Sequence, residues 1–131
     1  AFHCVKFIKN YDGDTLTVDI PNMHPFFGKN VKVRVLGLDT PEVKTDNKCE
    51  KDAARIARRL VENLLKRAQR IDLTEIDRDK YFRVLANVIV DGRSLKDVLI
   101  KENLAYEYYG GKKEKIDWCK FREGRKEEPT L

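Results

Sequence analysis

The chain begins with short stretches that alternate between apolar and polar positions, as β-strands do. Residues 4–10 and 15–20 are rich in Val, Ile, Phe and Thr, and Asp12-Gly13 between them is a common hairpin signal. Residues 31–35 alternate as a third strand should. Because proline cannot donate to a strand ladder, the strand region ends before Pro41.

A helical period replaces the alternation from Asn47 onward. Asn47 can cap a helix, and Glu50 stands three residues later, as in a capping box. The predicted apolar stripe consists of Ala53, Ile56, Leu60, Leu64 and Ala68. The other face is mostly basic, and we interpret it as a solvated surface.

The second half of the chain predicts two further strands and a short helix. Residues 71–76 and 84–90 carry the strand pattern. Ser94 can open a helix, which Asn103 ends in a left-handed conformation. Five strands and two helices predict an α+β domain on a small antiparallel sheet, closed as a five-stranded barrel.

The composition fits one soluble domain of 131 residues, of which 41% are hydrophobic. We expect this domain to span residues 1–119, with a charged and loosely held tail at 120–131 that lacks an apolar period. No window approaches eighteen consecutive apolar residues, which excludes a membrane span. We expect a monomer.

The charge is unevenly distributed along the chain. The formal net charge is +5, and residues 47–70 alone hold eight basic and three acidic residues. Residues 1–46 hold six of each. A polyanion is a reasonable partner, but the net charge lies mainly on the predicted helix.

Three acidic residues near strand ends are candidates for chemistry. Asp14, Asp39 and Glu42 offer hard oxygen ligands that suit Ca²⁺ or Mg²⁺. The simpler interpretation is a turn and a strand exit, and these motifs alone favour it. Arg34 and Arg83 could face the carboxylates, and a phosphate would complete such a site.

A set of motifs, taken together in this order and spacing, resembles the staphylococcal nuclease (thermonuclease) family. The motifs span roughly residues 11–109. They are Asp12-Gly13-Asp14-Thr15, Arg34 through Asp39-Thr40-Pro41-Glu42, Asp79-Lys80-Tyr81-Phe82-Arg83, Leu85-Ala86 with Val90-Asp91-Gly92, and Leu104-Ala105.

This resemblance implies an OB-fold barrel and a Ca²⁺-dependent endonuclease that hydrolyses DNA and RNA with low sequence specificity, leaving 3′-phosphate ends. Glu42 matches the proposed general base, and Arg34 and Arg83 match the arginines that bind the scissile phosphate. The remaining matches are Asp14, Asp39 and the Thr40 carbonyl for calcium, Asp12 near the ion, and Lys80, Tyr81 and Tyr109 for the substrate.

The sequence departs from the family in three places. Phe82 stands where the family commonly has glycine, which leaves the direction of Arg83 open. The third helix of the family is absent or shortened, since no segment of adequate length lies between Tyr109 and Trp118. The neighbouring tyrosines also leave Tyr108 as an alternative to Tyr109.

The three cysteines show no zinc-ligand spacing. With the third helix missing, we hypothesise that a disulfide from Cys49 to Cys119 pins the tail to the basic helix, with Cys4 left over. Three free thiols are the alternative. The sequence starts at Ala1 and shows no signal-peptide regions, which fits either a trimmed chain or a secreted or periplasmic protein in its mature form.

The competing function is a catalytically inactive OB-fold module that binds nucleic acid or a protein, since a fold alone does not specify activity. All of the matched catalytic and calcium residues are present, which favours the enzyme.

Overall fold

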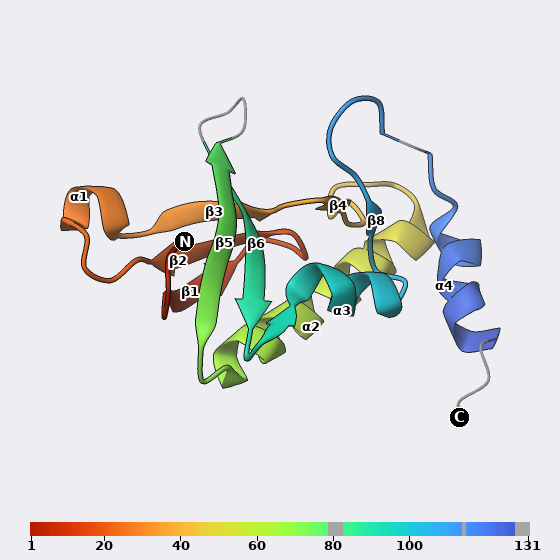
Figure 1. Cartoon of the computed structure of the whole chain (residues 1–131). Coiled ribbons are helices and arrows are strands. Elements are labelled where there is room, and N and C mark those ends of the chain that lie inside the picture. The colour runs from red at the N-terminus through yellow and green to blue at the C-terminus, as the bar shows by residue number, and fades with distance from the viewer. Residues whose placement is uncertain (79–82, 114, 128–131) are drawn as a thin grey trace.

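The computed structural model describes residues 1–78, 83–113 and 115–127 (Figure 1). Its main sheet has the strand order β1-β2-β3-β6-β5. These strands are β1 (Lys6–Asn10), β2 (Thr15–Asp19), β3 (Val31–Val35), β5 (Ile71–Arg78) and β6 (Val84–Val90). A short strand, β7 (Arg93–Ser94), pairs with β6, while β4 (Leu38–Asp39) pairs with β8 (Tyr106–Glu107).

One strand pair differs from the expected antiparallel sheet. β3 and β6 run parallel, with Arg34 opposite Leu85, whereas the other pairs are antiparallel. Strand direction follows from the long connection between β3 and β6, which local patterning does not encode. The prediction of an α+β, OB-type domain with a curled five-stranded sheet is confirmed. The direction of this pair is corrected, and the described residues form two helices more than the two predicted.

The sheet curls towards closure at its two outer strands. Just before β1, the N–H groups of Phe2 and Val5 donate to the carbonyls of Leu73 and Ile71 on β5, each at 2.9 Å. The start of the chain therefore joins the far edge of the sheet. The enclosed core is lined by buried side chains that alternate along the strands: Leu16, Val18, Val33, Val35, Leu73, Ala86 and Val88.

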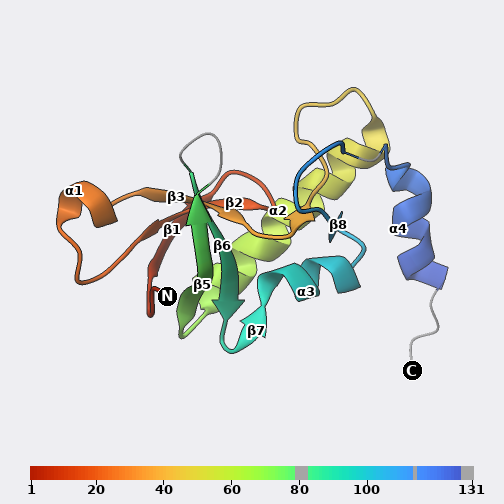
Figure 2. The same ribbon diagram turned by 45° about the horizontal axis from the view of Figure 1, so that its top comes forward.

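Within the described residues, four helices accompany the sheet, and Figure 2 shows α2 (Lys48–Arg67) crossing beneath it. α3 (Leu95–Lys101) follows β7, and α1 (Pro25–Gly28) is a single turn between β2 and β3. α4 (Trp118–Glu127) lies against α2 at the opposite end of the molecule from α1 (Figures 1 and 2). Among the residues described, no helix is both long enough and apolar enough to cross a membrane.

The α2 helix forms where the sequence predicts it, but its buried stripe is rotated. Asn47 caps it by accepting from the N–H of Glu50 at 2.9 Å, as expected. The predicted stripe residue Ile56 is 43% exposed. Of the other predicted stripe residues, Ala53 is buried, and Leu60, Leu64 and Ala68 are partly buried against the core. The prediction followed the larger apolar residues, whereas small alanines let α2 approach the sheet closely. The buried residues are Ala53, Ala54, Ala57, Val61 and Leu65.

The C-terminal region contains a helix that the sequence pattern did not reveal. The expected loose tail began at residue 120, yet α4 continues to Glu127. Its start is held by the buried Trp118 and by the hypothesised disulfide between Cys49 and Cys119, whose Cα atoms lie 5.1 Å apart. Cys4 is the free and exposed thiol, so the cysteine hypothesis is confirmed.

Candidate active site

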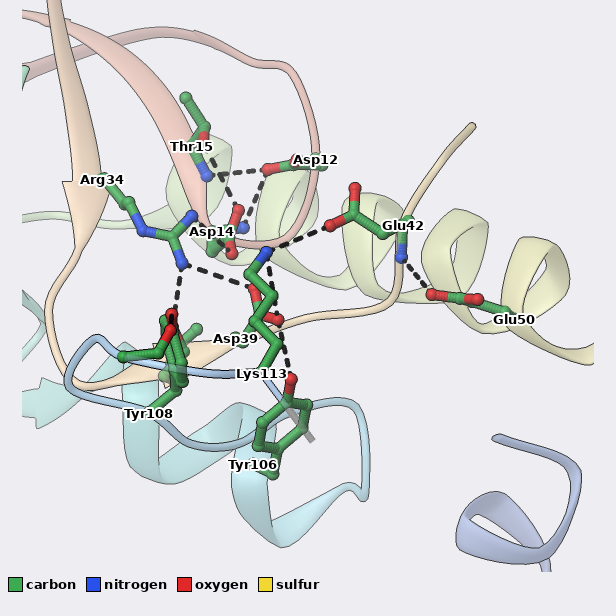
Figure 3. A network of polar contacts seen from close by, with 12 residues as sticks. Asp12, Asp14, Thr15, Arg34, Asp39, Glu42, Glu50, Tyr106, Tyr108 and Lys113 are labelled. Carbon is green, nitrogen blue, oxygen red and sulfur yellow. Dashed lines mark hydrogen bonds and ion pairs between the residues drawn. The ribbon is translucent and has the colours of Figure 1, made fainter. Parts of the chain in front are cut away.

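The turn between β1 and β2 is shaped by an aspartate. One carboxylate oxygen of Asp12 accepts from the N–H of Asp14 at 3.0 Å and of Thr15 at 2.8 Å. This side-chain turn fixes the backbone just where β2 begins, as aspartates do in tight turns. It directs Asp14 towards the end of β4 (Figure 3).

Close packing brings the turn against the rest of the site. A Cβ on Gly13 would lie 3.1 Å from both the Cβ of Ala57 on α2 and the Cγ2 of Thr40 after β4. Because a side chain at this position would push the turn away, the glycine is required for the approach. Two segments that are separate in sequence, around residues 12–15 and 38–42, therefore meet over α2.

Arg34 on β3 joins the two buried aspartates. Its Nη1 lies 3.2 Å from Oδ2 of Asp14, and its Nη2 lies 3.4 Å from Oδ1 of Asp39 and donates to the Leu38 carbonyl at 3.3 Å. Thr15, the first residue of β2, is the register partner of Arg34. The side chains of these two residues therefore project from the same face of the sheet. The predicted convergence of Asp14, Arg34 and Asp39 is present (Figure 3).

Two residues that the sequence analysis did not assign complete the contacts of Asp39. The hydroxyl of Tyr106 on β8 donates to Oδ2 of Asp39 at 2.8 Å. The ammonium of Lys113 lies 3.4 Å from the same oxygen and 3.3 Å from Oε1 of Glu42 (Figure 3). The pairing of β4 with β8, in which Asp39 stands opposite Tyr106, is the structural reason for the first contact.

Glu42 lies at the edge of the site rather than inside it. Its side chain is 58% exposed, and its N–H donates to Oε2 of Glu50 on α2 at 2.9 Å. The start of α2 therefore holds the backbone at Glu42, while Lys113 holds its carboxylate. The side chain is placed where solvent water can reach it.

The electrostatics of the site reflect buried negative charge. Burial raises the pKa of Asp14 from 3.8 to about 7, the charge of Asp12 adds to this, and Arg34 opposes it. Burial alone would lower the pKa of Arg34, but Asp14 and Asp39 raise it above its ordinary value. Burial alone would also lower the pKa of Lys113, but Asp39 and Glu42 raise it above its ordinary value. Arg34 thus stays charged beside Asp14, whose ionised form burial makes costly, and Lys113 stays charged beside Asp39 and Glu42.

These side chains line a cavity of about 800 Å³. Arg83, whose role was predicted from the resemblance, reaches its wall together with Thr40 and Glu42. A neighbouring cavity of about 560 Å³ shares Arg34, Arg83 and Lys113 with the first, and is also lined by Tyr108 and Tyr109. The predicted catalytic residues therefore line the first cavity, and Tyr108 and Tyr109 line the second.

The residues predicted to contact the substrate are either outside the described residues or away from the buried aspartates. Lys80, Tyr81 and Phe82 are outside the described residues. Tyr109 is 70% exposed, packs its ring over Gly37, and accepts from Nζ of Lys96 at 2.6 Å. Its substrate role stays a prediction.

The oxygen atoms of the candidate active site are of the type that binds hard metal ions. Within the described ranges, no group of three or more His, Cys, Asp or Glu side chains is arranged to hold one. Two carboxylates, Asp14 and Asp39, do meet beside Thr40, and they are hard oxygen donors. A bound divalent cation would offset the burial and like-charge repulsion that make ionised Asp14 costly. The residues therefore fit a hard cation.

Comparison with known proteins agrees with this geometry. Residues 32–126 match the model of the staphylococcal nuclease homologue family. The chain belongs to the staphylococcal nuclease family. Over 100 residues it is 38% identical to "Endonuclease YncB" of Bacillus subtilis (strain 168), an alignment that covers 75% of this chain and 44% of the relative.

Two further members of the staphylococcal nuclease family show the same partial coverage. The "SPbeta prophage-derived endonuclease YokF" of Bacillus subtilis (strain 168) is 37% identical over 100 residues, which are 75% of this chain and 32% of that protein. The "Thermonuclease" of Staphylococcus hyicus is 33% identical over 104 residues, 76% of this chain and 56% of that protein. The chain thus spans about a third to just over half of these relatives.

Proposed function

We propose that this protein is a calcium-dependent endonuclease that hydrolyses phosphodiester bonds of DNA and RNA with low sequence specificity. The observation that carries the proposal is the meeting of Asp14, Arg34 and Asp39 in a cavity that Glu42 and Arg83 also line. Relatives of the same family named as endonucleases and a thermonuclease support it.

In this proposal, Arg34 binds the phosphodiester. Its contacts within the described residues use three of the five N–H donors of a guanidinium, and the other two can donate to phosphate oxygens. Because Asp14 and Asp39 fix its orientation, little reorganisation is needed when charge develops on the phosphate. Arg83 adds a second positive charge at the same cavity.

In this proposal, Glu42 acts as the general base. Its exposed carboxylate can accept a proton from a water molecule, which then attacks the phosphorus from the solvent side. Calcium held by Asp14, Asp39 and the Thr40 carbonyl would supply further positive charge to the phosphodiester. By family resemblance, the bond between phosphorus and the 5′ oxygen breaks and that oxygen gains a proton, so the products carry a 3′-phosphate and a 5′-hydroxyl.

A disulfide also bears on where the protein works. Such bonds form and persist in oxidising compartments, so the Cys49–Cys119 bond supports a secreted or periplasmic location. We further propose that the enzyme is monomeric.

Cleavage assays on single-stranded DNA and RNA, with calcium or with EDTA, test the function. We expect cleavage in calcium only, reduced about 10²- to 10³-fold in Arg34→Gly and by a comparable factor in Glu42→Ser. Asp97→Asn, an exposed change on α3, serves as a folded control with full activity. A sample that binds nucleic acid without calcium-stimulated cleavage would instead be the inactive OB-fold binding module.

A further inference from the structure

The outer face of β1, β2 and β3 continues directly from the candidate active site. Strand register places Lys9 opposite Thr17, and Thr17 opposite Lys32. Thr15 and Arg34 form the next row of the same face, since side chains two residues apart on a strand point the same way. The inward positions between them, Leu16 and Val33, are buried, which fixes this face as the outer one.

This face of the sheet forms part of the wall of the 800 Å³ cavity of the candidate active site. Lys9, Thr17 and Lys32 line the same cavity as Asp14 and Arg34. The row with Arg34 and the row with Lys9 and Lys32 therefore both bear positive charge, and they extend along the sheet from the carboxylates in one direction. We call Lys9, Tyr11, Thr17 and Lys32 the sheet strip.

Tyr11 gives the sheet strip an aromatic surface. It lies in the turn between β1 and β2, lines the same cavity, and is 61% exposed. Its N–H donates to the Thr15 carbonyl at 2.9 Å, so its backbone is fixed although its ring is open to solvent. Basic groups beside an exposed ring are the combination that binds single-stranded nucleic acid, through phosphates and base stacking.

The sheet strip has a defined end. In the next row, Asp19 stands opposite Lys6, and the carboxylate of Asp19 accepts from the N–H of Asn30 at 2.9 Å, so this row carries one charge of each sign rather than an excess of positive charge. Adjacent strands are about 4.8 Å apart, so Lys9 and Lys32 lie about 10 Å from each other across β2. At this separation, Lys9 and Lys32 are two distinct cationic positions, each of which can contact a different phosphate.

We propose that the sheet strip binds the single-stranded nucleic-acid chain as it continues from the scissile phosphodiester. Lys9 and Lys32 contact two successive backbone phosphates, and Tyr11 stacks against a base. This inference rests on the proposed function for the position of the scissile group. The binding itself requires no turnover, which allows it to be tested separately.

The test measures the affinity of the full chain for a fluorescent 12-nucleotide DNA strand in EDTA, by anisotropy from 50 to 200 mM salt. Each phosphate contact on a single strand contributes about 0.7 to the salt slope, so Lys9→Gln/Lys32→Gln should lower it by about 1.4. At 0.1 M salt this corresponds to about 25-fold weaker binding. The matched control is Lys101→Gln/Lys120→Gln, which removes two exposed charges from α3 and α4, away from the strip (Figure 1), and should bind as the wild type does.

The aromatic contact is tested with the same strand. Tyr11→Ala should weaken binding about tenfold, and Tyr11→Phe, which keeps the ring, should restore it. If polyglutamate displaced the strand as well as DNA did and Tyr11→Ala had no effect, the strip would be a general anion surface and the inference would be overturned.

The outcomes separate the two proposals. An unchanged salt slope in Lys9→Gln/Lys32→Gln overturns the inference, even if the wild type cleaves DNA. A loss of affinity in that variant supports the inference even if calcium-dependent cleavage is absent and the proposed function fails.

Discussion

At the scale of single residues, Lys113 is the least expected member of the site. Its ammonium contacts Asp39 and Glu42, which the family resemblance assigns to calcium and to the general base. A lysine here supplies one positive charge from within the chain. This lysine and any divalent ion at the site would therefore compete for interaction with the same carboxylates.

We predict that Lys113→Gln binds calcium more tightly than the wild type does. Removing the ammonium takes one contact from Oδ2 of Asp39, which still accepts from Tyr106, and lowers the positive potential at the site, so an increase of about tenfold is expected. Calorimetric titration of the metal-free chain with calcium measures it. The control is Lys112→Gln, which removes an equal charge from an exposed neighbour. Weaker or equal affinity in Lys113→Gln would mean that the lysine does not compete for these carboxylates.

The sequence allowed the residues near motifs to be placed, but not those that arrive from far along the chain. Asp14, Arg34 and Asp39 stand on two predicted strands and their exits, so their approach could be expected. Lys113 is 71 residues from Glu42 and belongs to no motif. Its position depends on the path of the segment after β8, where Gly110 and Gly111 adopt positive φ. The tyrosine cluster was noticed, yet only the pairing of β4 with β8 selects Tyr106 for Asp39.

At the scale of elements, periodicity was informative for the strands and for the existence of α2, but not for which face of α2 is buried. α4 was missed for a related reason. Its sequence is strongly polar, and it is held by a few contacts rather than by a full apolar stripe. Trp118 packs against Phe121, and the side-chain amide of Asn103 donates to the Phe121 carbonyl at 3.0 Å. The contact with Asn103 and the disulfide to Cys49 are long-range, and such contacts leave no periodic signal.

We predict that Cys49→Ser/Cys119→Ser lowers the free energy of unfolding by about 3 kcal/mol. The bond closes a loop with a sequence separation of 70 residues, so it restricts the unfolded chain substantially. Urea unfolding followed by tryptophan fluorescence measures the change, since Trp118 begins α4. Cys4→Ser should leave the midpoint unchanged because that thiol is exposed and free. Equal midpoints for both variants would contradict the prediction.

At the scale of the whole molecule, closure of the barrel depends on its first residues. Asp72 on β5 accepts from the N–H of Cys4 at 2.9 Å and pairs with Arg70. These contacts reinforce the backbone bonds that the segment before β1 makes to β5. The hydrogen bond from Cys4, followed by Arg70, lowers the pKa of Asp72 below its usual 3.8.

We predict that Asp72→Asn destabilises the protein by about 1 kcal/mol at pH 7 and has almost no effect at pH 2. A carboxyl whose pKa is lowered by folding stabilises the native state above its unfolded value of 3.8. That stabilisation is lost as the pH falls from this value through the lowered one. Urea unfolding at both pH values measures the difference, with Asp46→Asn as an exposed control. A constant difference between the two pH values would show that charge is not the cause.

The net charge of the molecule is largely separate from the chemistry. Most of it lies on α2, and the cavity carries Arg34, Arg83 and Lys113 among its carboxylates. The charge on α2 would assist encounter with a polyanion. Composition therefore indicated a class of partner, while the reacting groups had to be found from motifs and their folding.

The disulfide also divides the chain in a way that concerns survival after damage. The carboxylates and Arg34 all precede Cys49, whereas Arg83, Tyr106 and Lys113 lie inside the ring that Cys49 and Cys119 close. A protease that cuts once within that ring, for example at the exposed Gly110–Gly111 bend, opens the ring without producing two molecules. The two pieces stay covalently joined until the bond is reduced, so the short piece with Lys113 remains tethered to the piece that carries the carboxylates and both arginines.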